Sequence, residues 1–95
     1  MRYITGEAMT EFNKLGYLCN NEVDDLYLEW YKDISNHTGK CIQFYVDDTV
    51  MAMIWDKETF DCHPARLSYD EIKAVNAQIE ELEFIKNARQ QRISF

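Results

Sequence analysis

Glycine and proline are scarce in this chain of 95 residues, which contains three glycines and one proline. The glycines, Gly6, Gly16 and Gly39, are isolated from one another, so the sequence contains no glycine-rich loop of the kind that cradles a phosphate group. It also contains no G-x-S-x-G motif of a serine hydrolase, and no internal repeat, low-complexity tract or linker. We therefore expect one domain over residues 1–95 and no nucleotide-binding loop.

Long hydrophobic runs are also missing. The first nine residues, MRYITGEAM, lack the apolar segment of a secretory signal, and no run approaches the length that spans a bilayer. We therefore expect a soluble, cytoplasmic protein with no membrane partner. The three cysteines, Cys19, Cys41 and Cys62, are odd in number and lack C-x-x-C spacing, which predicts free thiols rather than a disulfide framework.

Basic residues are few, because the chain has 10 basic and 17 acidic side chains and a formal net charge of -7. Such a chain would repel a phosphate backbone, which argues against direct binding of nucleic acid or of an anionic membrane. A basic protein surface is the more natural electrostatic partner. The structural alternative is a solvated acidic surface that maintains solubility.

Three segments show helical signals. The first runs from Thr5, a candidate N-cap, to Gly16, a left-handed stop. The second covers Asn21 to Ser35, where the apolar side chains recur with a helical period. The last begins with a capping box of Ser68 and Glu71 and extends to residue 92. The predicted buried faces are Ala8, Met9, Phe12 and Leu15 in the first helix and Ile72, Val75, Ile79 and Leu82 in the last.

Between the second and last helices, the period changes from 3.6 to 2 and the composition turns to β-branched and aromatic residues. The segments KCIQFYV and TVMAMIW predict two strands of an antiparallel hairpin with Asp47 and Asp48 in its turn. ETFDC adds a third short strand, and His63-Pro64 breaks the chain. Neither face of the two long strands is polar, so either helices cover both faces or one face is an interface. The predicted fold class is α+β, with two N-terminal helices, a two- or three-stranded antiparallel meander and a long C-terminal helix.

Acidic residues form a stripe along the predicted second helix. Glu22, Asp25, Glu29 and Asp33, spaced by three, four and four residues, fall within roughly 80° of one another on a helix. Successive carboxylates would advance about 6 Å along the axis, close to two phosphate steps of roughly 3.4 Å. Such a row imitates a phosphate backbone, and Asp47 and Asp48 extend it if the fold brings them alongside. The alternative is a solvated helix face.

A metal or cysteine site is the weaker alternative. Cys41, Cys62, His37 and His63 contain the ligand types of a tetrahedral zinc site, but adjacent ligands such as Cys62 and His63 point in divergent directions. A cysteine nucleophile needs a base at hydrogen-bond distance, which adjacency in sequence does not supply. We therefore predict no catalytic residue, no metal and no cofactor.

The leading hypothesis is a non-enzymatic protein-binding module that inhibits a larger partner by covering a basic surface. The predicted contacts are Glu22, Asp25, Glu29, Asp33, Asp47 and Asp48. In size, acidity, aromatic content and lack of catalytic motifs, the chain resembles the small phage-encoded inhibitors of bacterial defence systems, including anti-CRISPR proteins and nucleic-acid mimics. That resemblance covers no motif and assigns no residue. The alternatives are a structural or regulatory homodimer through the final helix or a sheet face, and a small zinc- or cysteine-dependent protein.

Overall fold

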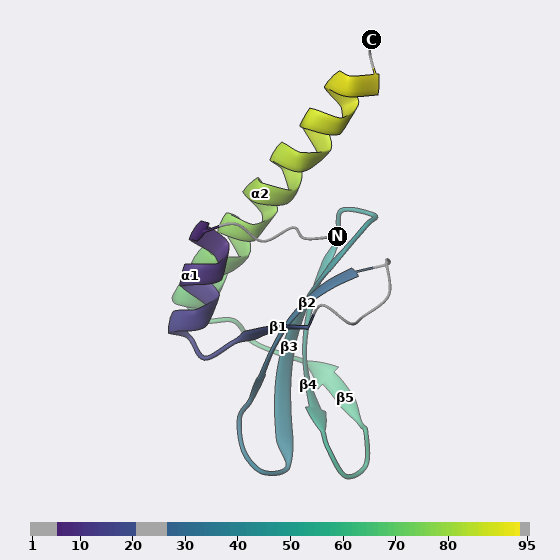
Figure 1. Ribbon diagram of the computed structural model, residues 1–95. Helices are drawn as coiled ribbons and strands as arrows, with labels where there is room; N and C mark the ends of the chain where they lie inside the picture. Colours follow the sequence, from purple (N-terminus) through teal and green to yellow (C-terminus); the bar gives the residue numbers. More distant parts are fainter. Residues whose placement is uncertain (1–5, 21–26, 94–95) are drawn as a thin grey trace. The chain divides into compact units, whose positions relative to one another are not determined.

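Figure 1 shows a computed structural model of the chain, which describes residues 6–20 and 27–93 and the side chains of these residues as far as residue 83. Within these residues the element order is α-β-β-β-β-β-α. The two helices form one compact unit and the strands form another, and each unit is described by itself. The α+β class is as predicted, whereas a single domain remains a prediction.

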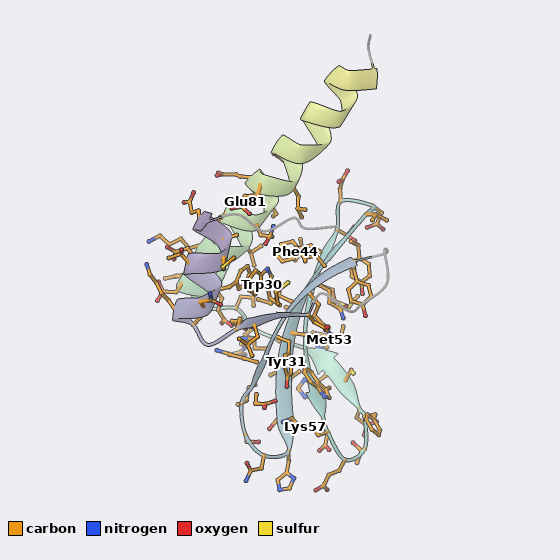
Figure 2. All side chains as sticks on the ribbon, viewed as in Figure 1. Trp30, Tyr31, Phe44, Met53, Lys57 and Glu81 are labelled. Atoms are coloured by element: carbon orange, nitrogen blue, oxygen red, sulfur yellow. The ribbon has the colours of Figure 1, made fainter. Side chains whose placement is uncertain are left out.

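Helices α1 (Gly6–Lys14) and α2 (Tyr69–Ile93) pack against each other. Ala8 and Phe12 of α1 are fully buried, as the helical period predicts. The backbone N–H of Ala8, which has no partner inside the first turn of a helix, donates to Oε1 of Glu81 at 3.2 Å. Glu81 lies in α2 and is labelled in Figure 2. One hydrogen bond therefore joins the start of α1 to the side of α2.

The local signals at the helix ends are confirmed. The hydroxyl of Ser68 accepts from the N–H of Glu71 at 3.1 Å, and Oε1 of Glu71 accepts from the N–H of Ser68 at 2.8 Å. These two bonds are the predicted capping box. Gly16 follows α1 with a φ of 87°, the left-handed conformation expected of a stop residue. The predicted N-cap, Thr5, lies outside the described residues.

The predicted buried faces of the helices are only partly right. Met9 and Ile72 are each 42% exposed, so their assignment to the core is wrong. Val75 is buried as predicted, and the other buried residues of α2 are small or polar, namely Glu71, Ala74, Ala77 and Gln78. Small side chains let two helices approach closely, so alanine can replace larger residues at such a contact. None of the helices in the described part of the chain is long and apolar enough to cross a membrane.

The sheet is an antiparallel meander in the order β1-β2-β3-β4-β5 (Figure 1). The hairpin predicted around Asp47 and Asp48 is confirmed. Asp48 adopts a φ of 67°, and the carboxylate of Asp47 accepts from the N–H of Thr49 at 3.2 Å. The strands are β1 (Leu18–Asn20), β2 (Tyr27–Asp33), β3 (Thr38–Tyr45), β4 (Val50–Asp56) and β5 (Cys62–Pro64).

The second predicted helix is wrong over residues 27–33, which form strand β2. In this segment Tyr27, Trp30 and Tyr31 are aromatic residues that favour a pleated, half-buried surface. Burial alternates along the start of the strand, with Leu28 and Trp30 buried and their neighbours half-buried. The spacing of the apolar residues fits both the helical period of 3.6 and the strand period of 2. Pairing with β1 and β3 makes the segment a strand. The part of the predicted helix over 21–26 lies outside the described residues.

The third predicted strand is also displaced along the chain. Residues 57–61 connect β4 to β5, where the carboxylate of Asp56 accepts from the N–H groups of Glu58 and Thr59 at 2.8 and 3.1 Å. His63 and Pro64, predicted to break the chain, belong to β5. Proline is tolerated there because β5 is an edge strand, where a residue can do without a donor. Both edge strands are only three residues long.

The register separates two faces of the sheet. On one face, here called the Trp30 face, Trp30 pairs with Ile42, and Leu28 pairs with Phe44. These four side chains are buried. The opposite face, here called the pocket face, carries the residues that alternate with them. Its three central rows across β2, β3 and β4 are Glu29-Gln43-Met51, Tyr31-Cys41-Met53 and Asp33-Gly39-Trp55.

Candidate functional site

A shallow, open pocket of about 280 Å³ lies on the pocket face of the sheet. Its lining residues come from all five strands, and the antiparallel register alone brings them together. Tyr31 and Met53 belong to the central row and are labelled in Figure 2. Aromatic and sulfur-containing side chains surround one carboxylate in the lining, whose main members are Glu29, Tyr31, Cys41, Met53, Trp55 and Cys62.

The Glu29 carboxylate is held in place by neutral donors. Its Oε2 accepts from Nδ2 of Asn20 at 3.1 Å, and its Oε1 accepts from Nε2 of Gln43 at 2.9 Å. The Cys41 thiol is a third neutral neighbour in the lining of the same pocket. In the described part of the chain, no basic side chain forms an ion pair with Glu29. The pocket therefore contains a fixed carboxylate whose charge is not neutralised by a described neighbour.

Trp55 forms the aromatic wall of the pocket because Gly39 leaves room for its ring. The two residues are partners across β3 and β4. A Cβ at Gly39 would lie 2.4 Å from Cζ2 of Trp55, far inside van der Waals contact. The ring of Tyr31 stands beside that of Trp55, with centroids 5.6 Å apart and planes tilted by 31°. Glycine at position 39 is thus what allows the two rings to form one wall.

One end of the wall is fixed by charge. Oδ1 of Asp33 accepts from the hydroxyl of Tyr31 at 3.1 Å and lies 2.7 Å from Nζ of Lys57. The hydrogen bonds from Lys57 and Tyr31 lower the pKa of Asp33, and the bond to Asp33 raises the pKa of Tyr31. Asp33 therefore orients the Tyr31 ring. Lys57, which is labelled in Figure 2, neutralises the negative charge of Asp33.

The negative charge of Glu29 acts on two neighbouring thiols. Burial, followed by the charge of Glu29, raises the pKa of Cys41 to about 12. The same two causes raise the pKa of Cys19 to about 11. Cys62, by contrast, is exposed in β5 at the rim of the pocket. The three thiols consequently differ in accessibility, and the two less accessible ones also have raised pKa values.

Alkylation at pH 8 should therefore modify Cys62 first. The attacking species is the thiolate, so a buried thiol with a pKa near 12 should react at least about a hundredfold more slowly than an exposed one. The measurement is the time course of iodoacetamide labelling of the native protein, resolved by peptide mass spectrometry. Labelling in denaturant is the control, since all three cysteines should then react at similar rates. Equal native rates at Cys41 and Cys62 would contradict this arrangement.

The predicted acidic stripe does not exist as a helical row. Glu29 and Asp33 do share a face, because a separation of four residues is even and strand side chains alternate. In a strand, however, their Cα atoms are about 13 Å apart rather than 6 Å, so the spacing that suggested phosphate mimicry is wrong for this pair. Glu22 and Asp25 lie outside the described residues.

Asp47 and Asp48 do not extend the site. They occupy the turn between β3 and β4, beyond the end of the sheet at which Tyr45 pairs with Tyr27. Asp33 stands at the opposite end, where it pairs with Gly39. The turn also uses Asp47 internally, through its bond to the N–H of Thr49. Of the four predicted contacts that the structure describes, Glu29 and Asp33 lie on the pocket face, and Asp47 and Asp48 lie in the turn.

The residues considered for zinc are dispersed. Cys41 and Cys62 both line the pocket, whereas His63 pairs with Ile54 and so belongs to the Trp30 face. His37 lies in the turn between β2 and β3, with its Nδ1 2.9 Å from Oε1 of Glu58. Among the described residues, no group of three or more histidine, cysteine, aspartate or glutamate side chains is placed to hold a metal ion.

Most residues of the pocket were not predicted from the sequence as members of a site. Its members in β3 and β4, among them Cys41, Met53 and Trp55, lie in segments that were predicted as strands. The sequence signal was the absence of a polar face on these strands. That signal could not identify Tyr31 or Asn20 as neighbours, because their segment was expected to be helical or a link between helices.

No protein-family model matches the chain, and searches of curated proteins and of solved structures find no match.

Proposed function

We propose that this protein is a non-enzymatic binding module that inhibits a larger partner by occupying a basic surface, and that the pocket face of its sheet makes the contact. The observation that carries the proposal is the open pocket in which Tyr31 and Trp55 stand beside the fixed carboxylate of Glu29. Aromatic and methionine side chains are enriched at the centres of protein interfaces, where they contribute much of the binding energy.

The charge of the chain supports the same function. A net charge of -7 accelerates encounter with a basic surface and disfavours a nucleic-acid partner. Inside the pocket, Glu29 adds a charged acceptor of fixed orientation beside aromatic and sulfur-containing side chains. Acceptors of this kind select the binding partner, while the surrounding rings slow its release. The mechanism is occupancy, so it requires no catalytic group.

A homodimer through the pocket face is the second candidate, because the same open face would be buried by a second copy. In a two-fold dimer each patch meets its own copy, so the Glu29 carboxylates of the two copies would approach each other. Like-charge contacts weaken association. Sedimentation velocity over a wide concentration range separates the two functions. A monomer throughout excludes the homodimer.

Affinity capture from extracts of the native host tests the proposal. The wild-type protein should retain a partner that a Tyr31→Ala and Trp55→Ala double variant retains at least about tenfold less, because truncated interface anchors commonly cost more than 1 kcal/mol each. Tyr69→Ala is the matched control, since Tyr69 is 92% exposed and lies in α2 rather than in the sheet. Capture should also weaken with added salt.

Two outcomes would contradict the proposal. Equal capture by all variants would place the contact on another surface. Failure of the wild-type protein to retain any partner, in extracts from several growth conditions, would contradict the proposal that the protein is a binding module. Circular dichroism of the double variant must show a wild-type spectrum for either comparison to be valid.

A further inference from the structure

The pocket contains a particular combination of groups. Two tilted rings form one wall, sulfur-containing side chains complete the lining, and a carboxylate lies in the adjacent row of the sheet. Along β2, Glu29 and Tyr31 are two residues apart and on the same face, which places their Cα atoms about 7 Å apart. One bound group of a few atoms could therefore touch the ring of Tyr31 and the carboxylate of Glu29 together.

We infer that the pocket binds the guanidinium group of an arginine side chain presented by the partner. This inference rests on the proposed function and specifies the chemistry that the pocket face recognises. A guanidinium is flat and delocalised, stacks on aromatic rings and is only weakly hydrated. It also carries N–H donors for Glu29. Anionic groups are disfavoured because the carboxylate has no described cationic partner.

The hydrogen bonds of Glu29 leave room for such a donor. A carboxylate offers about four acceptor sites, and the side-chain amides of Asn20 and Gln43 account for two neutral donors. Because these donors fix the orientation of the carboxylate before binding, little ordering is required when the cation enters. A charged donor forms a bond roughly twice as strong as a neutral one. The pocket is thus organised for one additional cationic N–H group.

Size and shape point to a side chain rather than to a free metabolite. The pocket volume of about 280 Å³ lies just below the range of about 300–1,000 Å³ that is typical of sites for drug-sized ligands. The site is also open, so the rest of a ligand would remain outside. An arginine on a protein surface satisfies both conditions, because its backbone stays outside while its planar head enters.

Nuclear magnetic resonance provides a test that requires no partner. Blocked tripeptides with arginine, citrulline, lysine or trimethyllysine at the centre are titrated into the 15N-labelled protein. Citrulline matches arginine in shape but is uncharged. The indole N–H of Trp55 should shift with the arginine peptide in the millimolar range, and citrulline should bind at least about tenfold more weakly. The indole of Trp30, which is 1% exposed, is the internal reference.

Substitution of the protein completes the test. Glu29→Gln keeps the size of the side chain but removes its charge and replaces one acceptor oxygen by an NH2 donor, and it should weaken arginine binding about tenfold. Tyr69→Ala should bind as the wild type does. The arginine peptide should also slow the alkylation of Cys62, which lines the pocket, without changing the labelling of the denatured protein.

Several results would overturn the inference. These are equal binding of arginine and citrulline, tighter binding of trimethyllysine, unchanged binding by Glu29→Gln, or no shift of the Trp55 indole at any peptide concentration. These results can be distinguished from results that contradict the proposed function. Capture of a partner that depends on Tyr31 and Trp55, without arginine binding, would sink the inference alone. Arginine binding without any captured partner would support the assignment of the pocket and contradict the proposed inhibitor function.

Discussion

Replacing Trp30 with alanine is expected to lower the free energy of unfolding by about 3–5 kcal/mol. Trp30 is 1% exposed and is one of the largest fully buried side chains of the described residues. Its neighbours across the sheet are Cys19 in β1 and Ile42 in β3. Truncation removes the buried apolar area of an indole and leaves a cavity that strands fixed by their register cannot close. For a domain of this size, such a loss is a large part of the total stability.

Trp55→Ala is the matched control, because it deletes the same indole from the neighbouring part of the sheet. Trp55 is only half-buried, so its loss should cost about 1–2 kcal/mol. Urea unfolding followed by circular dichroism measures both variants against the wild type. If the two substitutions cost the same, Trp30 does not occupy the central position in the core that its burial indicates.

Gly39→Ala is expected to destabilise the protein by about 1–3 kcal/mol, the usual cost of overpacking a filled site. The added Cβ would lie 2.4 Å from a ring carbon of Trp55, so the indole must leave its position. The wall that Trp55 forms with Tyr31 would then be lost. One methyl group should therefore reduce stability and abolish the shift of the Trp55 indole by the arginine peptide.

Two controls isolate this steric cause. Gly6→Ala should be neutral or slightly stabilising, because a Cβ at Gly6 meets nothing within 4 Å and alanine favours the helix. In a Trp55→Ala background the Gly39→Ala substitution should cost almost nothing. The coupling free energy from this double-mutant cycle should thus be about 1–3 kcal/mol, the full cost of Gly39→Ala in the wild type. Additive effects would show that the ring does not cause the requirement for glycine.

Features encoded by neighbouring residues were predictable. The capping box of Ser68 and Glu71, the left-handed Gly16 and the hairpin turn at Asp47 each depend on a few adjacent positions. The two faces of β3 and β4 followed from simple alternation. Each of these features has a short-range physical cause, so a single sequence is enough to identify it.

Strand β2 shows why the remainder was not predictable. Its apolar residues recur with a spacing that suits one face of a helix, yet Leu28 and Trp30 also alternate as in a strand. The choice depends on hydrogen bonds to β1 and β3, which are distant partners absent from a local window. The pocket was not predictable for the same reason, since all five strands supply its lining residues. Of its lining residues, only Glu29 was predicted as a contact with the partner. That prediction rested on a row of acidic residues along a helix, whereas Glu29 lies in strand β2.

The two short edge strands have a consequence for the protein in concentrated solution. An exposed strand edge is a template on which another chain can add, and this is a common origin of aggregation and fibrils. Among the described residues, β1 and β5 each contribute three residues to an edge, and Pro64 removes one donor from β5. Within this part of the chain, neither strand offers a long run of backbone groups. These two strands are therefore poor templates for polymerisation of the protein strand by strand.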